Sequence, residues 1–341
     1  MVAGSLICIA GVAITQRQCS EQQSIRITHA CTETIMSVLP TNSLFEGFSR
    51  LDHTTTGVHF AGVMGGDGPP VLLLHGYPET HATWHAVAPA LAQRFSIVAP
   101  DLPGYGRSLV RNDGAWAKRD VATELVSLMQ SLGHRRFAVV GHDRGARVGY
   151  RLALDFPQQV TAYCSIAVVP TLDVWPAVDR EFAKRAFHWF LFAQPGDLPE
   201  RLLAADPDAF LDDTLDHMAH GLSSLHQIAV ADYREAFAKA SVRRAIIKDY
   251  RAAYDIDVQH DAADRRAGRK IACPVLVLWP RHQRLVADRG HDDVLTPGTV
   301  WRRWADDVRE VDIDGGHLLP EQAPEAVVET LISFLAQHGR E

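Results

Sequence analysis

The chain has 341 residues, of which 47% are hydrophobic and 22% charged, a balance typical of a globular protein with a sizeable core. Its formal net charge of -7 argues against a nucleic-acid-binding protein, which would need a basic face. No CxxC spacing occurs, so a disulfide framework or a zinc site is not expected; the five cysteines are Cys8, Cys19, Cys31, Cys164 and Cys273.

The first 35 residues are treated apart from the fold. Residues 2–14 are apolar, but no basic segment precedes them and the run is too short to span a membrane. We interpret 1–35 as a disordered extension or a start-site artefact, with Met36 as the natural first residue. A secretory signal is the alternative. The first interpretation predicts a cytoplasmic protein and the second a periplasmic or secreted one; neither predicts a membrane protein.

Short apolar runs and helix-like segments alternate along the chain from about residue 55. The sequence of residues 55–70 predicts two short strands. Continuous apolar strands alternating with helices predict a mostly parallel sheet with helices on both faces. The runs predict buried strands at 71–75, 95–100, 137–142, 162–169 and 274–279, and the segments between them predict helices at 81–92, 118–132 and 145–156.

The strand signal disappears between about 170 and 262, where the sequence is helical in character. The predicted architecture is therefore a core in two pieces, 36–169 and 263–341, with a helical cap at 170–262. An insertion of this length usually has a function, and a lid over an active site is consistent with its position in the chain.

The central chemical signal is the pentapeptide from Gly141 to Gly145, which directly follows the strand FAVV and opens a helix. In lipases and esterases the nucleophile lies on a sharp turn between a strand and a helix, and the turn has the sequence pattern G-x-S-x-G. Here the central residue is Asp143. A carboxylate that attacks a saturated carbon displaces a leaving group and forms an alkyl ester, which activated water must then hydrolyse. This α/β-hydrolase pattern predicts Asp143 as the nucleophile.

His317 is the predicted base, because it follows the strand-like segment REVDID and comes after the nucleophile in chain order. His142 is expected to point away from the site, and His75 to be structural. Two backbone N–H groups, those of Tyr77 and Arg144, are predicted to hold the oxyanion formed during ester hydrolysis.

The residues resemble the fluoroacetate (haloacetate) dehalogenases of the α/β-hydrolase fold from about Phe45 to Leu335. Related haloalkane dehalogenases and epoxide hydrolases carry Trp after the nucleophile, where this chain has Arg144. The matching stretches are HGYPETHATWH at 75–85, DLPGYGRS at 101–108, GHDRGARVGYRLALDFP at 141–157, HWFLFAQP at 188–195, DYRAAYD at 249–255 and GGHLLPEQAP at 315–324.

Arg144 and Arg147 lie three residues apart at the start of one predicted helix, so both can face one pocket. Two guanidinium groups suit the carboxylate of a haloacetate and favour an ionised Asp143. The resemblance further implies halide donors from the cap, matched here to His188, Trp189 and Tyr233. It implies no metal or organic cofactor. The expected partners are a small haloacid and water, and homodimers are common in the family.

The sequence departs from the family pattern at the acid that orients the base. In the family, the pattern L-D-x-x-P-T stands at the end of the strand that follows the helix after the nucleophile turn, or elbow. This chain has Ala167 at the position of the acid. The segment 279–284, the usual alternative place, contains no carboxylate. Asp173 and Asp288 are the nearest substitutes in sequence. Because loss of this acid slows related triads by as much as about 10⁴-fold, we expect ready ester formation and slow turnover.

Three functions follow as alternatives. The first is a hydrolase that releases halide from a short haloacid. The second is an epoxide hydrolase, which would leave the arginine pair unexplained. The third is a degenerate homologue that binds small carboxylates without turnover, for which Ala167 is the best evidence.

Overall fold

The computed structural model describes residues 44–112, 114, 116–281, 283, 285 and 296–338. Asp288 and the extension at 1–35 lie outside these ranges. No helix within them is long and apolar enough to cross a bilayer.

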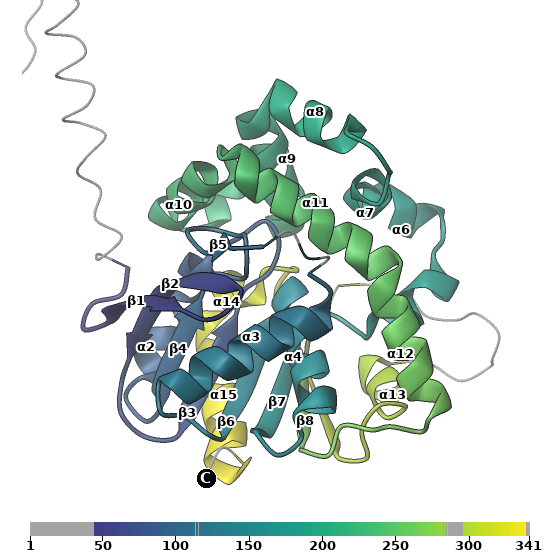
Figure 1. The fold of residues 1–341 in the computed structure, drawn as a ribbon. Helices are drawn as coiled ribbons and strands as arrows, with labels where there is room; N and C mark the ends of the chain where they lie inside the picture. The colour runs from purple at the N-terminus through teal and green to yellow at the C-terminus, as the bar shows by residue number, and fades with distance from the viewer. Residues whose placement is uncertain are drawn as a thin grey trace, which may run out of the picture. The chain divides into compact units, whose positions relative to one another are not determined.

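The described residues form a mostly parallel sheet in the order β1-β2-β4-β3-β6-β7-β8-β9, with β5 paired to β2 (Figure 1). Pairs involving β2 are antiparallel and the other pairs are parallel. The strands are β1 (Ser49–Thr54), β2 (Val58–Gly65), β3 (Pro70–Leu74), β4 (Ser96–Pro100), β5 (Leu109–Val110), β6 (Phe137–His142), β7 (Val160–Ile166), β8 (Val275–Pro280) and β9 (Val308–Ile313).

Helices cover the sheet and form the segment between β7 and β8. The strands β3, β6, β7 and β8 are buried along their whole length, which explains their continuous apolar sequences. The core helices are η2 (His81–Trp84), α2 (Ala88–Leu91), α3 (Lys118–Ser131), α4 (Arg144–Asp155), α13 (Pro297–Trp301), α14 (Leu319–Gln322) and α15 (Pro324–His338).

Between β7 and β8 the described chain is helical from Thr171 to Arg266, and α7 to α11 lie above one end of the sheet in Figure 1. These helices enclose the region where several parallel strands end. They are α5 (Thr171–Val174), η3 (Trp175–Ala177), α6 (Arg180–Arg185), α7 (Phe187–Phe192), α8 (Leu198–Ala205), α9 (Pro207–Ala219), η4 (Leu222–Ser224), α10 (Gln227–Phe237), α11 (Ala240–Tyr254) and α12 (Ile256–Arg266).

Two local predictions differ from the structure. The helix expected at 81–92 is a 3-10 turn followed by the short α2, because Pro89 has no N–H to continue a helical ladder and instead lies in the first turn of a new helix. The two-stranded pattern expected from residue 55 is one strand, β2. Its partner β1 precedes it, pairing Ser49 with Met64.

Gly145 allows α4 to pack directly on the strand ends. A Cβ at this position would lie 2.2 Å from the carbonyl oxygen of Leu74 and 2.5 Å from that of His75, and both are backbone atoms that cannot rotate away. We therefore expect Gly145→Ala to lower the free energy of unfolding by roughly 3 kcal/mol in urea denaturation. Gly114→Ala is the control, because its nearest atom is a side-chain oxygen at 3.2 Å. Equal stability of the two variants would contradict this steric role of Gly145.

Candidate active site

Asp143 lies on a strained turn between β6 and α4. Its backbone has φ 44° and ψ -109°, a conformation that few non-glycine residues adopt. A Cβ at Gly141 would lie 2.5 Å from the backbone of Ala146, so the turn can close this tightly only with glycine there. The turn directs the Asp143 carboxylate to the cavity under the cap helices.

The groups around Asp143 favour its ionised form. The backbone N–H of Tyr77 donates to Oδ2 of Asp143 over 3.2 Å. Burial would raise the pKa of this carboxyl, but His317, His142, Arg144 and Arg147 lower it to about 2. At neutral pH the carboxylate is therefore charged and held by an N–H group that can also stabilise an oxyanion.

His317 lies opposite the nucleophile, with Nε2 3.8 Å from Oδ1 of Asp143. Burial lowers the pKa of His317 to about 4, although the Asp143 carboxylate opposes this shift. The imidazole is therefore neutral at pH 7 and can accept a proton from a water molecule placed between the two groups.

Gln283 occupies the place of the orienting acid. Its Oε1 lies 3.0 Å from Nδ1 of His317, and its Nε2 donates to the carbonyl oxygen of Ala167 over 2.9 Å. The second bond fixes the amide so that oxygen faces the ring, and Nδ1 of His317 carries the proton. Gln283 orients the base as an acid would, but its neutral amide cannot stabilise an imidazolium charge.

Asp173, one of the two carboxylates considered as substitutes, does not take this role. Asp173 accepts hydrogen bonds from Arg265, Arg303 and Nε1 of Trp304, so its oxygens are engaged in a separate ion cluster. Asp288 lies outside the described residues. Only a carboxylate was expected in this role, so the amide of Gln283, which lies in the segment 279–284, was not predicted.

His142 lies behind the nucleophile, as expected, and has a partner that the sequence did not indicate. Its Nδ1 is 2.9 Å from Oε2 of Glu79, and its Nε2 is 2.8 Å from the carbonyl oxygen of His317. Burial opposes a charge on the ring, but the Glu79 carboxylate raises the pKa of His142. His75 is structural: Nδ1 lies 2.8 Å from the Gly76 oxygen, and Nε2 accepts from Leu102 N–H.

Arg144 and Arg147, in the first turn of α4, are both buried beside Asp143 but differ in their contacts. Nη1 of Arg147 donates to the carbonyl oxygen of Val169 and to Oγ1 of Thr171, and its guanidinium lies 4.8 Å from the ring centroid of Trp189. Arg144 is already paired with Asp249, its Nε lying 2.6 Å from Oδ2. Of the two, only Arg147 lines the cavity.

Arg144 keeps one buried N–H group, Nη1, without a hydrogen-bond partner, and Arg147 keeps its Nε in the same state. An unsatisfied buried N–H of a cation is costly, and an anionic ligand is the group that satisfies it best.

The cavity has a volume of about 450 Å³ and brings Asp143, His317 and Arg147 together with cap residues. His188 and Trp189 of α7 line it, and burial lowers the pKa of His188 to about 3, so its ring is neutral. Ala167 and Gln283 also line it.

Tyr233, the third predicted halide donor, is not among the residues that line this cavity. Its hydroxyl donates to Oε1 of Glu321 over 2.7 Å. Tyr250 does not line the cavity either, but it contacts residues of the site: its ring centroid lies 5.5 Å from that of His188 and 4.2 Å from the Arg144 guanidinium carbon. The tripeptide Asp-Tyr-Arg occurs twice, at 232–234 and 249–251, and the sequence alone does not distinguish them.

Comparisons with known proteins show the family of the chain. Residues 69–324 match the model of the α/β-hydrolase fold family. A fluoroacetate dehalogenase from Burkholderia sp. is 34% identical over 86% of this chain and 95% of its own length. A soluble epoxide hydrolase from Corynebacterium sp. (strain C12) is 28% identical over 80% of this chain and 92% of its own length.

Among solved structures, a mutant of a "putative epoxide hydrolase" from Pseudomonas aeruginosa, with bound MFA, has a TM-score of 0.82 and 49% identity. The match covers 86% of this chain and 97% of the Pseudomonas aeruginosa chain. The matched family model and the 34% identity confirm the predicted fold and the predicted relationship to fluoroacetate dehalogenases. The chain is a hydrolase of the α/β-hydrolase family.

Proposed function

We propose that the protein is a hydrolytic dehalogenase that releases halide from haloacetates. The observation that carries this proposal is the ionised Asp143 on its elbow, flanked by the buried guanidinium groups of Arg144 and Arg147 and faced by the neutral base His317. A carboxylate nucleophile suits a saturated carbon, and guanidinium groups suit a substrate that carries a carboxylate of its own.

In the first step an oxygen of Asp143 attacks the α-carbon of the haloacetate. The new C–O bond forms as the carbon–halogen bond breaks, and the halide leaves with the bonding electron pair. His188 and Trp189 line the cavity, and burial keeps the pKa of the Tyr250 hydroxyl well above its usual value, so that it remains a donor. These neutral donors would stabilise the departing halide.

In the second step His317 removes a proton from water, and the resulting hydroxide attacks the carbonyl carbon of the Asp143 ester. The backbone N–H groups of Tyr77 and Arg144 receive the oxyanion, and glycolate leaves with a proton returned by His317. The re-formed Asp143 carboxyl, with a pKa of about 2, then releases its own proton to water. Arg147 would hold the substrate carboxylate, and Arg144 would add its Nη1 while it remains paired with Asp249. Because Gln283 stands where an acid is usual, this step is expected to be slow.

The direct test measures halide and glycolate after incubation with chloroacetate and with fluoroacetate. Styrene oxide is the parallel substrate, since several relatives are named epoxide hydrolases. Halide release without diol formation supports the proposal. Diol formation without halide release would replace it with an epoxide hydrolase, and tight haloacetate binding with neither alkylation nor halide release would indicate a carboxylate-binding homologue.

Removing the guanidinium of Arg147 should act mainly on substrate binding. We expect Arg147→Met to lower kcat/KM for chloroacetate by about 10²-fold or more, largely through KM, because a charged hydrogen-bond partner of the carboxylate is lost. Arg147→Lys is the matched control, which keeps the charge and should recover part of the loss. An unchanged KM in Arg147→Met would show that the carboxylate binds elsewhere.

The low pKa of His317 predicts an unusual pH profile for ester hydrolysis. The base acts only when neutral, so protonation slows the step, and a pKa near 4 places that loss well below the ordinary range for histidine. We expect the single-turnover rate of ester hydrolysis, followed by mass spectrometry of the intact protein, to stay within about twofold between pH 7.5 and 5.5. A fall with a midpoint between pH 6 and 7 would contradict it.

A further inference from the structure

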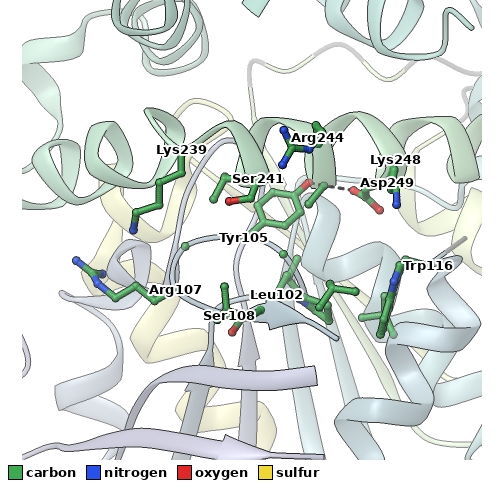
Figure 2. Close-up of a pocket in the computed structure, with 18 of the residues that line it drawn as sticks. Leu102, Tyr105, Arg107, Ser108, Trp116, Lys239, Ser241, Arg244, Lys248 and Asp249 are labelled. Carbon is green, nitrogen blue, oxygen red and sulfur yellow. Dashed lines mark hydrogen bonds between the residues drawn. The ribbon is translucent and has the colours of Figure 1, made fainter. Parts of the chain in front are cut away.

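The protein holds Arg144 and Arg147 in two different ways. Nε of Arg144 pairs directly with the carboxylate of Asp249 over 2.6 Å, and the same carboxylate accepts a hydrogen bond from the Tyr105 hydroxyl over 3.0 Å (Figure 2). Arg147 forms no ion pair with the side chains that the structure describes, and its buried Nε has no hydrogen-bond partner. Its charge therefore has no direct partner and can pair with a substrate carboxylate.

Uncharged oxygens hold Arg147 in place. Its Nη1 carries two N–H groups and has two acceptors, the carbonyl oxygen of Val169 at 3.1 Å and Oγ1 of Thr171 at 2.9 Å. Thr171 is the first residue of α5. These acceptors fix the guanidinium without neutralising it.

The Thr171 hydroxyl is connected to a buried carboxylate through one tyrosine. The hydroxyl oxygen of Tyr150, on α4, lies 3.3 Å from Oγ1 of Thr171 and 2.7 Å from Oδ2 of Asp261, on α12. Each of these three residues is only 1% exposed. We call Thr171, Tyr150 and Asp261 the Arg147 support chain. It joins Arg147 to the first and the last helix of the segment between β7 and β8.

The hydrogen bonds of the Arg147 support chain have a direction, because each hydroxyl carries one proton. A carboxylate only accepts hydrogen bonds, so the Tyr150 hydroxyl donates its proton to Asp261, which is its nearer partner. The oxygen of Tyr150 is then free to accept the proton of Thr171. Oγ1 of Thr171 consequently presents its remaining lone pairs to Arg147. Asp261 thus orients the hydroxyl that holds the arginine.

We propose that Asp261, acting through Tyr150 and Thr171, positions Arg147 for the carboxylate of the substrate. The three are positioning residues, since none of them is among the described residues that line the cavity. A carboxylate bonded directly to Arg147 would compete with the haloacetate, and the two hydroxyl groups between them avoid that competition. This role rests on the proposed function, because it requires Arg147 to receive the substrate carboxylate.

The dissociation constants of fluoroacetate and of its neutral analogue fluoroacetamide test the proposal. Every protein compared carries Asp143→Asn, so that no ester forms and fluorine NMR reports binding alone. Burial raises the pKa of Asp261 to about 7, so the titrations are made at about pH 8.5, where this group is a carboxylate.

Tyr150→Phe removes one hydroxyl and no charge. We expect it to weaken fluoroacetate binding by about fivefold to tenfold and fluoroacetamide binding by less than about twofold, because only the carboxylate depends on Arg147. Thr171→Val should weaken fluoroacetate binding at least as much. Adding Tyr150→Phe to Thr171→Val should then change the dissociation constant by less than about twofold, since the chain is already broken. Thr171→Val carries the test if Tyr150→Phe does not fold.

Two substitutions of Asp261 separate orientation from charge. Coulomb attraction alone predicts that loss of a negative charge strengthens binding of an anion. We expect the opposite for Asp261→Leu, a weakening of fluoroacetate binding by about fivefold, because the acceptor for Tyr150 is lost. Asp261→Asn loses the same charge but keeps an oxygen that can accept from Tyr150, and it should recover most of this loss.

Tyr163→Phe is the matched control. Tyr163 is also buried, its hydroxyl donates to the carbonyl oxygen of Ala146 in α4 over 2.7 Å, and its ring packs on Trp301 as that of Tyr150 does. We expect Tyr163→Phe to leave both dissociation constants within about twofold of those before substitution. An equal weakening in Tyr150→Phe and Tyr163→Phe would indicate a general loosening of α4 and would overturn the proposal.

Fluoroacetate binding that is absent, or that is unchanged or tighter in Tyr150→Phe and Asp261→Leu, would also overturn it, as would equal losses for fluoroacetate and fluoroacetamide. Halide release by the unsubstituted protein is measured separately, so the two conclusions can fail independently. Halide release with unchanged binding in the variants would contradict the positioning role alone. Weakened fluoroacetate binding in the variants without any halide release would contradict the proposed function alone.

Discussion

Asp143→Asn is expected to abolish halide release from chloroacetate, with a loss of about 10⁴-fold or more. The neutral amide is a poor nucleophile, so no alkyl ester forms. The substitution preserves shape, and asparagine tolerates the positive φ of 44° at this turn, so the fold should be retained. The Tyr77 N–H can still donate to the amide oxygen.

Mass spectrometry of the intact protein gives the direct measurement for this variant. The unsubstituted protein mixed with chloroacetate should gain one carboxymethyl group on Asp143, and Asp143→Asn should gain none. Asp314→Asn is the matched control, because Asp314 lines the same cavity from an exposed position. Retained halide release in Asp143→Asn, or an equal loss in Asp314→Asn, would show that Asp143 is not the nucleophile.

The elbow and its sheet were predictable because their signals are local. A buried parallel strand needs a continuous apolar run, and the turn into α4 needs glycine at 141 and 145 because a Cβ there would meet backbone atoms at 2.2–2.5 Å. Place in the fold then selected His317 from seventeen histidines, and the structure puts its Nε2 3.8 Å from Asp143. Local spacing and topology together were sufficient to predict that Asp143 and His317 lie close to each other.

The cap residues were harder to predict because their positions depend on packing between helices. Tyr233 and Tyr250 stand in the same tripeptide, yet one hydroxyl bonds to Glu321 and the other ring contacts Arg144 and His188. Which tyrosine faces the nucleophile is set by how α10 and α11 pack. No periodicity within either segment contains that information.

The pairing of Arg144 with Asp249 was unpredictable for a related reason. The two residues are 105 positions apart and meet only because α11 crosses the start of α4. Sequence reasoning assigned both arginines equally to a substrate carboxylate. The structure commits Nε of Arg144 to Asp249 and leaves Arg147 as the arginine that lines the cavity.

Ala167 stands at the position where the family pattern has the acid that orients the base. Its side chain lines the same cavity as His317, and its carbonyl oxygen accepts the hydrogen bond that orients Gln283. Gln283 supplies an acceptor to His317 but no charge, so the imidazolium formed when water is deprotonated is stabilised poorly. A carboxylate beside the ring would correct this deficiency.

We therefore expect Ala167→Asp to accelerate hydrolysis of the alkyl ester by about 10–10³-fold while leaving ester formation nearly unchanged. The added carboxylate should also raise the pKa of His317, so that the fall in rate at acid pH moves upward from about 4. Ala167→Asn is the matched control: both residues tolerate the φ of 64° at this position better than alanine, but only Asp adds a charge. Rapid-quench mass spectrometry separates ester formation from hydrolysis. Equal hydrolysis rates in the two variants would mean that Gln283 alone orients and stabilises the base sufficiently, and that turnover is limited by another step.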